Sequence, residues 1–377
     1  MIQVDGTWQR SYQNAIGRWA GVGPYYAMFP IEFAFDVVSR FTEENDWVLD
    51  PFAGRYSSVY AAATQQRHGL GIEIHPVGWI YGQAKLHTAP KSDVETRLKE
   101  LGYRSRWFGK RSRQILPEFF EYCYSPEILS FLLTARNDLN WRESEVDATL
   151  MALILIILHA KEGSGLSNQM RQSKAMAPDY SIRWWKENEK VPPDYDPIEF
   201  IQNKLDWRYK EGVPETQRSK VVLNDSMQYL ETVSKKVLNG EQERFSLLLT
   251  SPPYYDITHY HYDQWLRLWM LGGKSFPTKK EDVNRGRFSS KRHYEQLLDT
   301  VFEYSALLMT EQATVYVRTD ARKFTLTTTR KVLRRHFPIG EWDMNETARP
   351  VEGQSQTALF GDFAPKPGEV DLILQRF

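Results

Sequence analysis

Residues 47–54 read Trp-Val-Leu-Asp-Pro-Phe-Ala-Gly, and this stretch decides the fold. Its apolar first half predicts a buried strand, and the proline and glycine that follow predict a tight turn. A helical pattern comes next over residues 57–66, and a second short strand is expected over residues 69–74. A strand, a turn, a helix and a strand in this order predict a crossover connection. The sequence therefore predicts the opening of a doubly wound α/β sheet.

The chain divides into three regions that differ in their residue patterns. Residues 1–99 hold the start of the sheet, with a further helix expected over residues 30–42. Residues 100–215 lack strand alternation and are predicted to form a mostly helical insertion around an apolar helix near residues 150–158. Residues 216–377 return to alternating strands and helices and are predicted to complete the sheet. Further strands are expected over residues 220–223, 246–250, 313–317 and 370–375.

Composition places few limits on function. The chain has 377 residues, 41% of them apolar and 25% charged, as in a globular protein of one or two domains. Its 48 basic and 48 acidic residues cancel, which excludes a globally basic nucleic-acid coat protein but not a local basic groove. The single cysteine, Cys123, excludes an intrachain disulfide and favours a buried thiol in a reducing compartment. The start of the chain is polar, and the longest apolar run, 148–160, is too short to span a bilayer, so a cytoplasmic location is expected.

A second stretch, residues 247–254, carries the strongest chemical signal. It reads Leu-Leu-Leu-Thr-Ser-Pro-Pro-Tyr, a hydrophobic strand that runs directly into two prolines. Prolines fix the backbone and remove N–H donors, so the strand end is rigid and its carbonyls face outward. The Ser251 hydroxyl and the Pro252 carbonyl could accept the two N–H bonds of an amino group, with Pro253 as support and Tyr254 stacked on a planar ring. The alternative is a proline-rich turn, which the combination of strand and motif makes less probable.

The Gly54 turn predicts a site for a small ligand. A strand followed by glycine and a helix start leaves backbone N–H groups for an anionic group, here the carboxylate of an amino acid moiety. Glu73 follows the next predicted strand about 20 residues later, where an acid binds ribose hydroxyls. Asp225 ends another strand and could accept a hydrogen bond from a ligand amino group. It could equally cap the helix that follows, and the sequence leaves these two interpretations open.

These motifs together resemble a known family. Asp-Pro-Phe-Ala-Gly at residues 50–54 and Ser-Pro-Pro-Tyr at residues 251–254 are similar to the amino-group DNA methyltransferases, which make N4-methylcytosine or N6-methyladenine. Residues 25–30, Tyr-Tyr-Ala-Met-Phe-Pro, resemble the family's segment before the cofactor loop. The resemblance implies a Rossmann-like methyltransferase fold, S-adenosylmethionine as cofactor and double-stranded DNA as substrate. A serine at position 251 favours cytosine N4 over adenine N6.

The resemblance also implies which residues do the work. The catalytic set is Ser251, Pro252, Pro253 and Tyr254. The cofactor-binding set is Tyr26, Phe29, Asp50, Pro51, Phe52, Ala53, Gly54, Glu73 and Asp225. One departure stands out, because the family loop continues Ser-Gly-Thr where this chain has Arg55-Tyr56-Ser57. We expect these bulky side chains beside the methionine moiety. They either weaken cofactor binding or, through Arg55, supply a partner for its carboxylate.

The order of the motifs places a recognition region in the helical insertion. A cofactor motif, a long insertion and then the catalytic motif resemble the arrangement in which the insertion reads the target. Basic and amide side chains there suit phosphates and base edges. The predicted DNA-binding residues are Arg104, Arg106, Lys110, Arg111, Asn168, Arg171 and Lys174. The base is expected to rotate out of the duplex, since its amino group is otherwise out of reach.

Several alternatives stay open. An RNA or protein methyltransferase of the same fold could use a similar proline pair. The change at Arg55-Tyr56 is also compatible with a catalytically inactive DNA-binding relative. A nicotinamide oxidoreductase is disfavoured because the full Gly-x-Gly-x-x-Gly loop is absent. A cognate restriction endonuclease is a conceivable partner. The histidines near residues 259–261 lack further ligands of the right kind, so no metal is expected.

Overall fold

The computed structural model describes residues 9–23, 30–107, 116–256, 260–278, 290–349 and 368–376. The predicted residues Tyr26, Phe29, Lys110 and Arg111 lie outside them.

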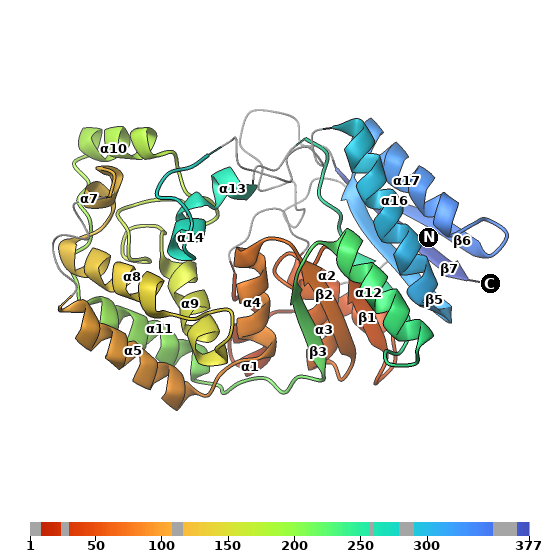
Figure 1. Ribbon diagram of the computed structural model, residues 1–377, viewed down its shortest axis with the longest axis horizontal. Helices are drawn as coiled ribbons and strands as arrows, with labels where there is room; N and C mark the ends of the chain where they lie inside the picture. Colours follow the sequence, from red (N-terminus) through yellow and green to blue (C-terminus); the bar gives the residue numbers. More distant parts are fainter. Residues whose placement is uncertain are drawn as a thin grey trace.

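A seven-stranded sheet forms the centre of the described structure (Figure 1). Its order is β3-β2-β1-β4-β5-β7-β6, so the chain crosses over from the centre to each edge. All neighbouring pairs are parallel except those of β7, which runs antiparallel to both β5 and β6. The strands are β1 (Trp47–Asp50), β2 (His68–Glu73), β3 (Ser219–Leu223), β4 (Phe245–Thr250), β5 (Met309–Asp320), β6 (Trp342–Arg349) and β7 (Glu369–Arg376). The doubly wound sheet expected from the sequence is confirmed.

Helices cover both faces of the sheet, because its central strands are apolar on both sides. In β4, Leu247 and Leu249 belong to one core, whereas Leu248 belongs to the other. Helices α2 (Ile31–Phe41), α3 (Ser57–Thr64) and α4 (Pro76–Leu86) contribute to the first core, and α1 (Ala15–Ala20) lies beside α3. Helices α12 (Ser226–Leu238), α16 (Lys291–Leu308) and α17 (Lys323–His336) contribute to the second.

The stretch between β2 and β3 is helical, as expected, and most of it lies to one side of the sheet (Figure 1). After α4 it contains α5 (Lys91–Ser105), α7 (Phe119–Cys123), α8 (Pro126–Asp138), α9 (Glu145–Ile157), α10 (Pro178–Glu187) and α11 (Pro197–Tyr209). The predicted apolar helix is α9, in which every residue from Asp147 onward is buried. Cys123 is also buried. Where the boundaries between regions fall stays a prediction.

The segment after the proline motif joins the sheet to the helical part. Helix α13 (Tyr260–Asp263) lies next to α14 (Trp265–Met270), and α14 contacts α8 and α4 (Figure 1). Arg267 of α14 is fully buried, and its guanidinium donates to the carbonyls of Leu155 and Gln172 at 3.0 and 2.6 Å. Arg267 thereby ties α14 to α9 and to the loop that holds Gln172.

Strand β6 is the one strand of the described sheet that the sequence pattern does not predict. Its residues read Trp-Asp-Met-Asn-Glu-Thr-Ala-Arg, with few apolar side chains. It is an edge strand that pairs only with β7, and its side chains are mostly part-exposed or exposed. An edge strand needs little apolar alternation, which explains the weak signal. Within the described residues, no helix is both long and apolar enough to cross a membrane.

Candidate functional site

The two motifs that the sequence singles out meet at one edge of the sheet. Strands β1 and β4 are adjacent and parallel, with Val48 opposite Leu247, so the segments that follow them leave the sheet side by side. The Thr250 hydroxyl donates to the Asp50 carboxylate at 2.7 Å, which joins two strand ends 200 residues apart in the chain. The carboxyl edge of a parallel sheet is where such folds bind their ligands.

The Asp50 carboxylate is completely buried and serves the protein itself. It accepts hydrogen bonds from Thr250, from the Ser58 hydroxyl and from the Phe52 backbone N–H. Burial raises its pKa to about 6, although the hydrogen bonds act in the opposite direction. Because this side chain has no exposed surface, it anchors the turn and does not offer a contact to a ligand. That differs from the direct cofactor contact expected from the sequence.

The turn after β1 does not present free amides in the way we expect from the sequence. Four of its backbone N–H groups donate to acceptors within the protein: Phe52 to Asp50, Ala53 to the Ile72 carbonyl at 3.0 Å, Gly54 to Glu73 at 2.8 Å, and Tyr56 to the Ala53 carbonyl at 2.6 Å. These four amides already have partners within the protein, and whether the N-terminus of the following helix binds an anionic group stays a prediction. The turn is instead held rigidly against the end of β2.

Glu73 is the acid that organises this edge. One carboxylate oxygen accepts from Gly54 N–H at 2.8 Å and the other from His75 N–H at 2.7 Å. Burial raises the pKa of Glu73 to about 7, and these two backbone hydrogen bonds hold it from rising further. A backbone hydrogen bond from Ile74 also acts to lower its pKa. A carboxylate has about four acceptor positions, so Glu73 keeps capacity to accept from a ligand. The side chain is only part-buried, so a ligand can reach it.

Gly78 is a site residue that sequence reasoning missed. It lies in the first turn of α4, and a Cβ atom there would come within 2.3 Å of the Gly54 carbonyl oxygen. Only glycine lets the turn after β1 approach α4 this closely. The available signal is a glycine inside an otherwise helical stretch, which has a packing reason when the helix is well formed.

Asp225 caps helix α12. Its carboxylate accepts from the Met227 backbone N–H at 3.0 Å, so the capping interpretation left open by the sequence is the observed one. The neighbouring Ser226 hydroxyl donates to the Pro51 carbonyl, and the Asn224 N–H donates to the Glu73 carbonyl at 3.1 Å. The ends of β1, β2 and β3 are thus linked into one site. Capping leaves Asp225 part-exposed there.

Tyr56 does not crowd the ligand side of the turn. It has the left-handed backbone conformation, with φ of 63°, and its side chain is completely buried. The hydroxyl donates to the Val222 carbonyl at 2.9 Å. The ring lies against two glycines, since a Cβ at Gly71 or Gly82 would be 2.5 or 2.4 Å from it. The expectation of a bulky side chain beside the ligand is therefore wrong for Tyr56, which points into the core.

Arg55 remains near the site. Its guanidinium donates to the Gly23 carbonyl at 3.3 Å and to the Ser57 hydroxyl at 3.1 Å. Burial and the nearby charge of Arg10 lower its pKa to about 10, so it stays cationic at neutral pH. A role as the partner of a ligand carboxylate stays a prediction.

The proline motif begins at the surface and turns inward. Ser251 and Pro253 are part-exposed and Pro252 is buried. Tyr254 is only 3% exposed, and its hydroxyl donates to the Glu369 carboxylate at 3.1 Å. A ring that stacks on a substrate must present one face to it, so stacking by Tyr254 requires its cover to move. The hydroxyl clearly anchors the motif to β7.

A buried charged network lies behind this anchor. The Arg318 guanidinium forms a two-pronged ion pair with Asp371, with distances of 2.7 and 2.9 Å. Tyr316 and Arg349 donate to the same carboxylate at 2.8 and 3.0 Å. Burial acts to raise the pKa of Asp371, but the charge and hydrogen bonds of Arg318, together with Tyr316 and Arg349, outweigh it and the pKa is lowered. Arg318 therefore holds β5 to β7 and is not a free group facing a ligand.

The predicted DNA-binding residues do not gather in one place. Asn168 is buried and donates to the carbonyls of Tyr122 and Lys190 at 3.0 and 3.1 Å, so it holds its own loop together and cannot reach a base. Arg104 pairs with Asp138 at 3.0 Å. It and Arg106 lie at the end of α5, on the helical side away from the sheet (Figure 1).

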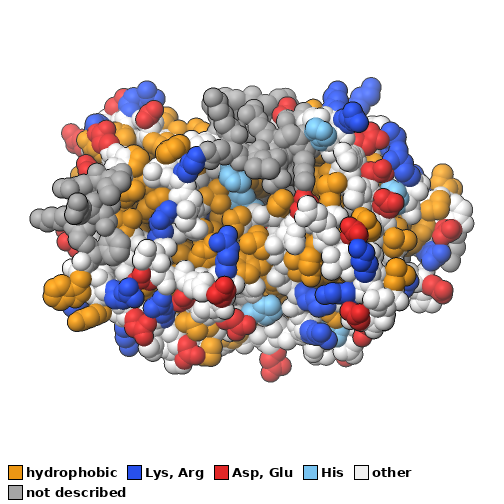
Figure 2. All heavy atoms as spheres, in the orientation of Figure 1, with side chains coloured by type: hydrophobic (Ala, Val, Ile, Leu, Met, Phe, Trp, Pro, Cys, Tyr) orange, Lys and Arg blue, Asp and Glu red, His pale blue; other side chains and the backbone are white. Residues whose placement is uncertain are grey.

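The other two predicted DNA contacts lie on the loop beside α14. Arg171 is exposed and Lys174 is part-buried. This loop packs on α14 through the bond from Arg267 to Gln172. Basic and acidic side chains are interspersed over the face shown in Figure 2, with no broad patch of one sign. Within the described residues, no group of three or more potential ligand side chains could hold a metal ion.

The sheet with its helical insertion is the Rossmann-like methyltransferase fold. A family model described as DNA methylase, N6_N4_Mtase, matches residues 3–77, which include β1, the turn and β2. A Type II methyltransferase, M.MthZI of Methanothermobacter thermautotrophicus, is 38% identical over 48 residues. That match spans 13% of this chain and only 14% of the relative. The resemblance to the amino-group methyltransferases is thereby confirmed over the N-terminal region.

Two solved structures show similarity at low identity. A putative rRNA methylase from Clostridium thermocellum aligns over 93% of this chain and 98% of its own, with 6% identity and a TM-score of 0.35. The rRNA methyltransferase aviRa from Streptomyces viridochromogenes aligns over 97% and 96%, with 12% identity and a TM-score of 0.33.

Burial of Tyr56 predicts how substitutions there behave. Tyr56→Phe removes the hydrogen bond to Val222 and is expected to lower the free energy of unfolding by about 1 kcal/mol. Tyr56→Ala leaves a cavity between the two glycines and is expected to lower it by about 3–5 kcal/mol. Urea unfolding followed by circular dichroism measures both. A Tyr56→Ala variant as stable as the natural protein would contradict this packing.

Proposed function

We propose that this protein transfers a methyl group from S-adenosylmethionine to an exocyclic amino group of a DNA base, with cytosine N4 favoured over adenine N6. The observation that carries the proposal is the junction of the two motifs, in which Thr250 binds Asp50 across adjacent strands. It joins the start of the proline motif to the turn that the family uses for its cofactor. Two reacting partners held at one sheet edge can react without a covalent intermediate.

The residues at this edge fit an adenosyl group. Glu73 and Asp225 are part-buried carboxylates that follow adjacent strands, where hydroxyl and amino donors can be bound. Because Gly78 has no side chain, the turn after β1 can lie close to α4. When bound, S-adenosylmethionine supplies a methyl group on a positively charged sulfur. Since four turn amides are already engaged, we assign the amino acid carboxylate to Arg55, which remains charged.

Ser251 and Pro252 act on the amino group of the substrate. The Ser251 hydroxyl and the Pro252 carbonyl each accept one N–H bond, which directs the nitrogen lone pair toward the methyl group. The proline pair keeps both acceptors fixed. Their position is held from two sides, by Thr250 on Asp50 and by Tyr254 on Glu369. Such preorganised positioning is the main contribution a protein makes when the donor already has a good leaving group.

The base must leave the duplex to reach this edge, and unstacking costs a few kcal/mol. Double-stranded DNA is therefore the proposed partner, and a paired restriction endonuclease stays a prediction. The alternatives that the sequence leaves open are adenine N6, an amino group of RNA, and an inactive DNA-binding relative. Each gives a different result in a transfer assay.

Removal of the Ser251 hydroxyl tests the proposal directly. With tritiated S-adenosylmethionine and unmethylated duplex DNA, the natural protein is expected to label the DNA. Ser251→Ala is expected to lower kcat about 100-fold, as loss of one positioned polar group in an active site does. Ser246→Ala, at the other end of the same strand, is the matched control and keeps its activity. Label in RNA alone, or no transfer although cofactor binds, would refute the proposal.

Tyr254→Phe separates anchoring from stacking. The substitution keeps the ring but removes the hydroxyl that bonds to the Glu369 carboxylate and contacts the Ser251 side chain. If the hydroxyl anchors the motif, Tyr254→Phe lowers the free energy of unfolding by about 1.5–3 kcal/mol, the usual cost of losing a hydrogen bond to a charged group. It then also lowers kcat. Tyr254→Ala is expected to abolish turnover. Full activity in Tyr254→Phe, measured in the same tritium assay, would leave stacking as the only role of this residue.

The raised pKa of Glu73 predicts pH-dependent cofactor affinity. The ionised carboxylate is the form that accepts hydrogen bonds from hydroxyls, and in the free protein it is half-formed near pH 7. Affinity for S-adenosylmethionine is therefore expected to rise between about pH 6 and about pH 8, because less proton release accompanies binding. Titration calorimetry measures it. Glu73→Gln should lose this rise, and an identical pH profile in that variant would show that another group titrates.

A further inference from the structure

A groove runs along α14 beside the candidate active site. It consists of two adjoining hollows of about 410 and about 370 Å³ that share Gly273, Lys274 and Phe276. We call it the α14 groove. Its cationic side chains are Arg136, Arg142 and Lys274, with His261 beside them, and its aromatic side chains are Trp141, Trp265, Trp269 and Phe276. Among the described residues that line it, none is acidic.

The turn after α14 separates the two hollows and is held in one conformation. Gly272 has φ of 101°, which favours glycine, and a Cβ on Gly273 would meet the Leu268 carbonyl oxygen at 2.8 Å. Arg136 donates to the carbonyls of Trp269 and Gly273 at 2.7 and 3.0 Å. The turn after α14 is thus fixed, and it presents Lys274 and Phe276 outward. Phe276 is 50% exposed, with the Lys274 ammonium 5.8 Å from its ring centre.

One end of the α14 groove abuts the site edge. Pro76 and His261 line it there. The His261 ring packs edge-on against His75, with centroids 5.5 Å apart, and the His75 N–H is one of the two donors to Glu73. On the other wall, Arg142 covers the ring of Trp141 at 4.2 Å and is itself exposed. The α14 groove therefore reaches the end of β2, at the same edge of the sheet as the proline motif.

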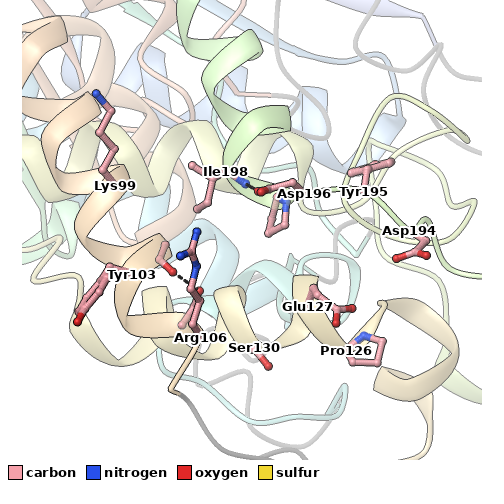
Figure 3. A pocket seen from close by; sticks show the side chains of 13 residues that line it. Lys99, Tyr103, Arg106, Pro126, Glu127, Ser130, Asp194, Tyr195, Asp196 and Ile198 are labelled. Atoms are coloured by element: carbon pink, nitrogen blue, oxygen red, sulfur yellow. Dashed lines mark hydrogen bonds between the residues drawn. The ribbon is translucent and has the colours of Figure 1, made fainter.

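A larger groove elsewhere on the molecule carries side chains of both charges. The hollow of about 820 Å³ in Figure 3 lies between α5, α8 and the start of α11. Lys99 and Arg106 line it, but so do Glu127, Asp194 and Asp196. Three carboxylates repel phosphate groups, so size alone does not make it a nucleic-acid surface. It offers a matched control on the same chain.

We propose that the α14 groove binds the phosphodiester backbone of the nucleic-acid substrate next to the target base, with Arg142 and Lys274 at phosphates and Phe276 stacked on an unpaired base. Trp141, Trp265 and Trp269 are buried, so Phe276 is the exposed ring of the groove. An exposed aromatic ring beside cationic side chains is a surface that single strands bind. Strand opening next to an extruded base would supply such a stretch. The identity of the strand as substrate rests on the proposed function.

The test is the salt dependence of binding. Fluorescence anisotropy with a labelled 20-nucleotide single strand and the corresponding duplex, in DNA and in RNA form, gives affinity at several salt concentrations. The double variant Arg142→Gln/Lys274→Gln is expected to bind more weakly regardless of base sequence. The slope of log affinity against log salt should fall by about 1.4 for single strands and about 1.8 for duplexes, for two lost phosphate contacts. Phe276→Ala should weaken single-strand binding about fivefold or more.

The controls separate the outcomes. Lys99→Gln/Tyr103→Ala, in the groove of Figure 3, should leave affinity and slope unchanged, and thermal unfolding checks that every variant is folded. Unchanged affinity and slope in the α14 groove variants overturns the inference, even if the natural protein methylates DNA. Reduced affinity and slope in those variants supports it, even if no methyl transfer is found and the proposed function fails. A loss seen only with RNA supports the groove and overturns DNA as its strand.

Discussion

The hydrogen bond between Thr250 and the buried Asp50 carboxylate is the contact on which the candidate site depends. A charged group without exposed surface needs partners, and Asp50 finds them in Thr250, Ser58 and Phe52. Because these partners come from two strand ends and the first turn of α3, satisfying one carboxylate fixes three segments at once. The turn after β1 and the proline motif after β4 consequently share one rigid frame.

The other end of the proline motif is also held by a buried carboxylate. Tyr254 reaches Glu369, and the adjacent pair Arg318 and Asp371 joins β5 to the antiparallel strand β7. Buried ion pairs add little net stability, but each removes the freedom of its partners to adopt other arrangements. A motif held between two buried carboxylates cannot drift relative to the sheet. Positional accuracy of this kind is what a reaction without covalent intermediates requires.

Sequence patterns predicted the parts of this structure that depend on local burial. The buried strands and the helix α9 carry long apolar runs, and the two motifs lie at strand ends, so their meeting followed from sheet geometry. Side-chain partners were beyond such patterns, because they depend on residues distant in the chain. Nothing near Gly54 shows that Glu73 will occupy its amide, and nothing near Asn168 shows that two backbone carbonyls will claim its side chain. The polar edge strand β6 was not predicted because it has few apolar residues of its own. It pairs with β7, which supplies the buried apolar side chains of this strand pair.

The buried ring of Tyr56 links three positions that lie far apart in the chain. A left-handed backbone site usually favours glycine, but here position 56 carries a tyrosine, and its ring fills the space that side chains at Gly71 and Gly82 would need. In a related chain with glycine at position 56, the counterparts of Gly71 and Gly82 should carry larger residues. Substitutions at these positions should accordingly be accepted in combination and rejected singly, which makes this triad a marker for recognising close relatives of the protein.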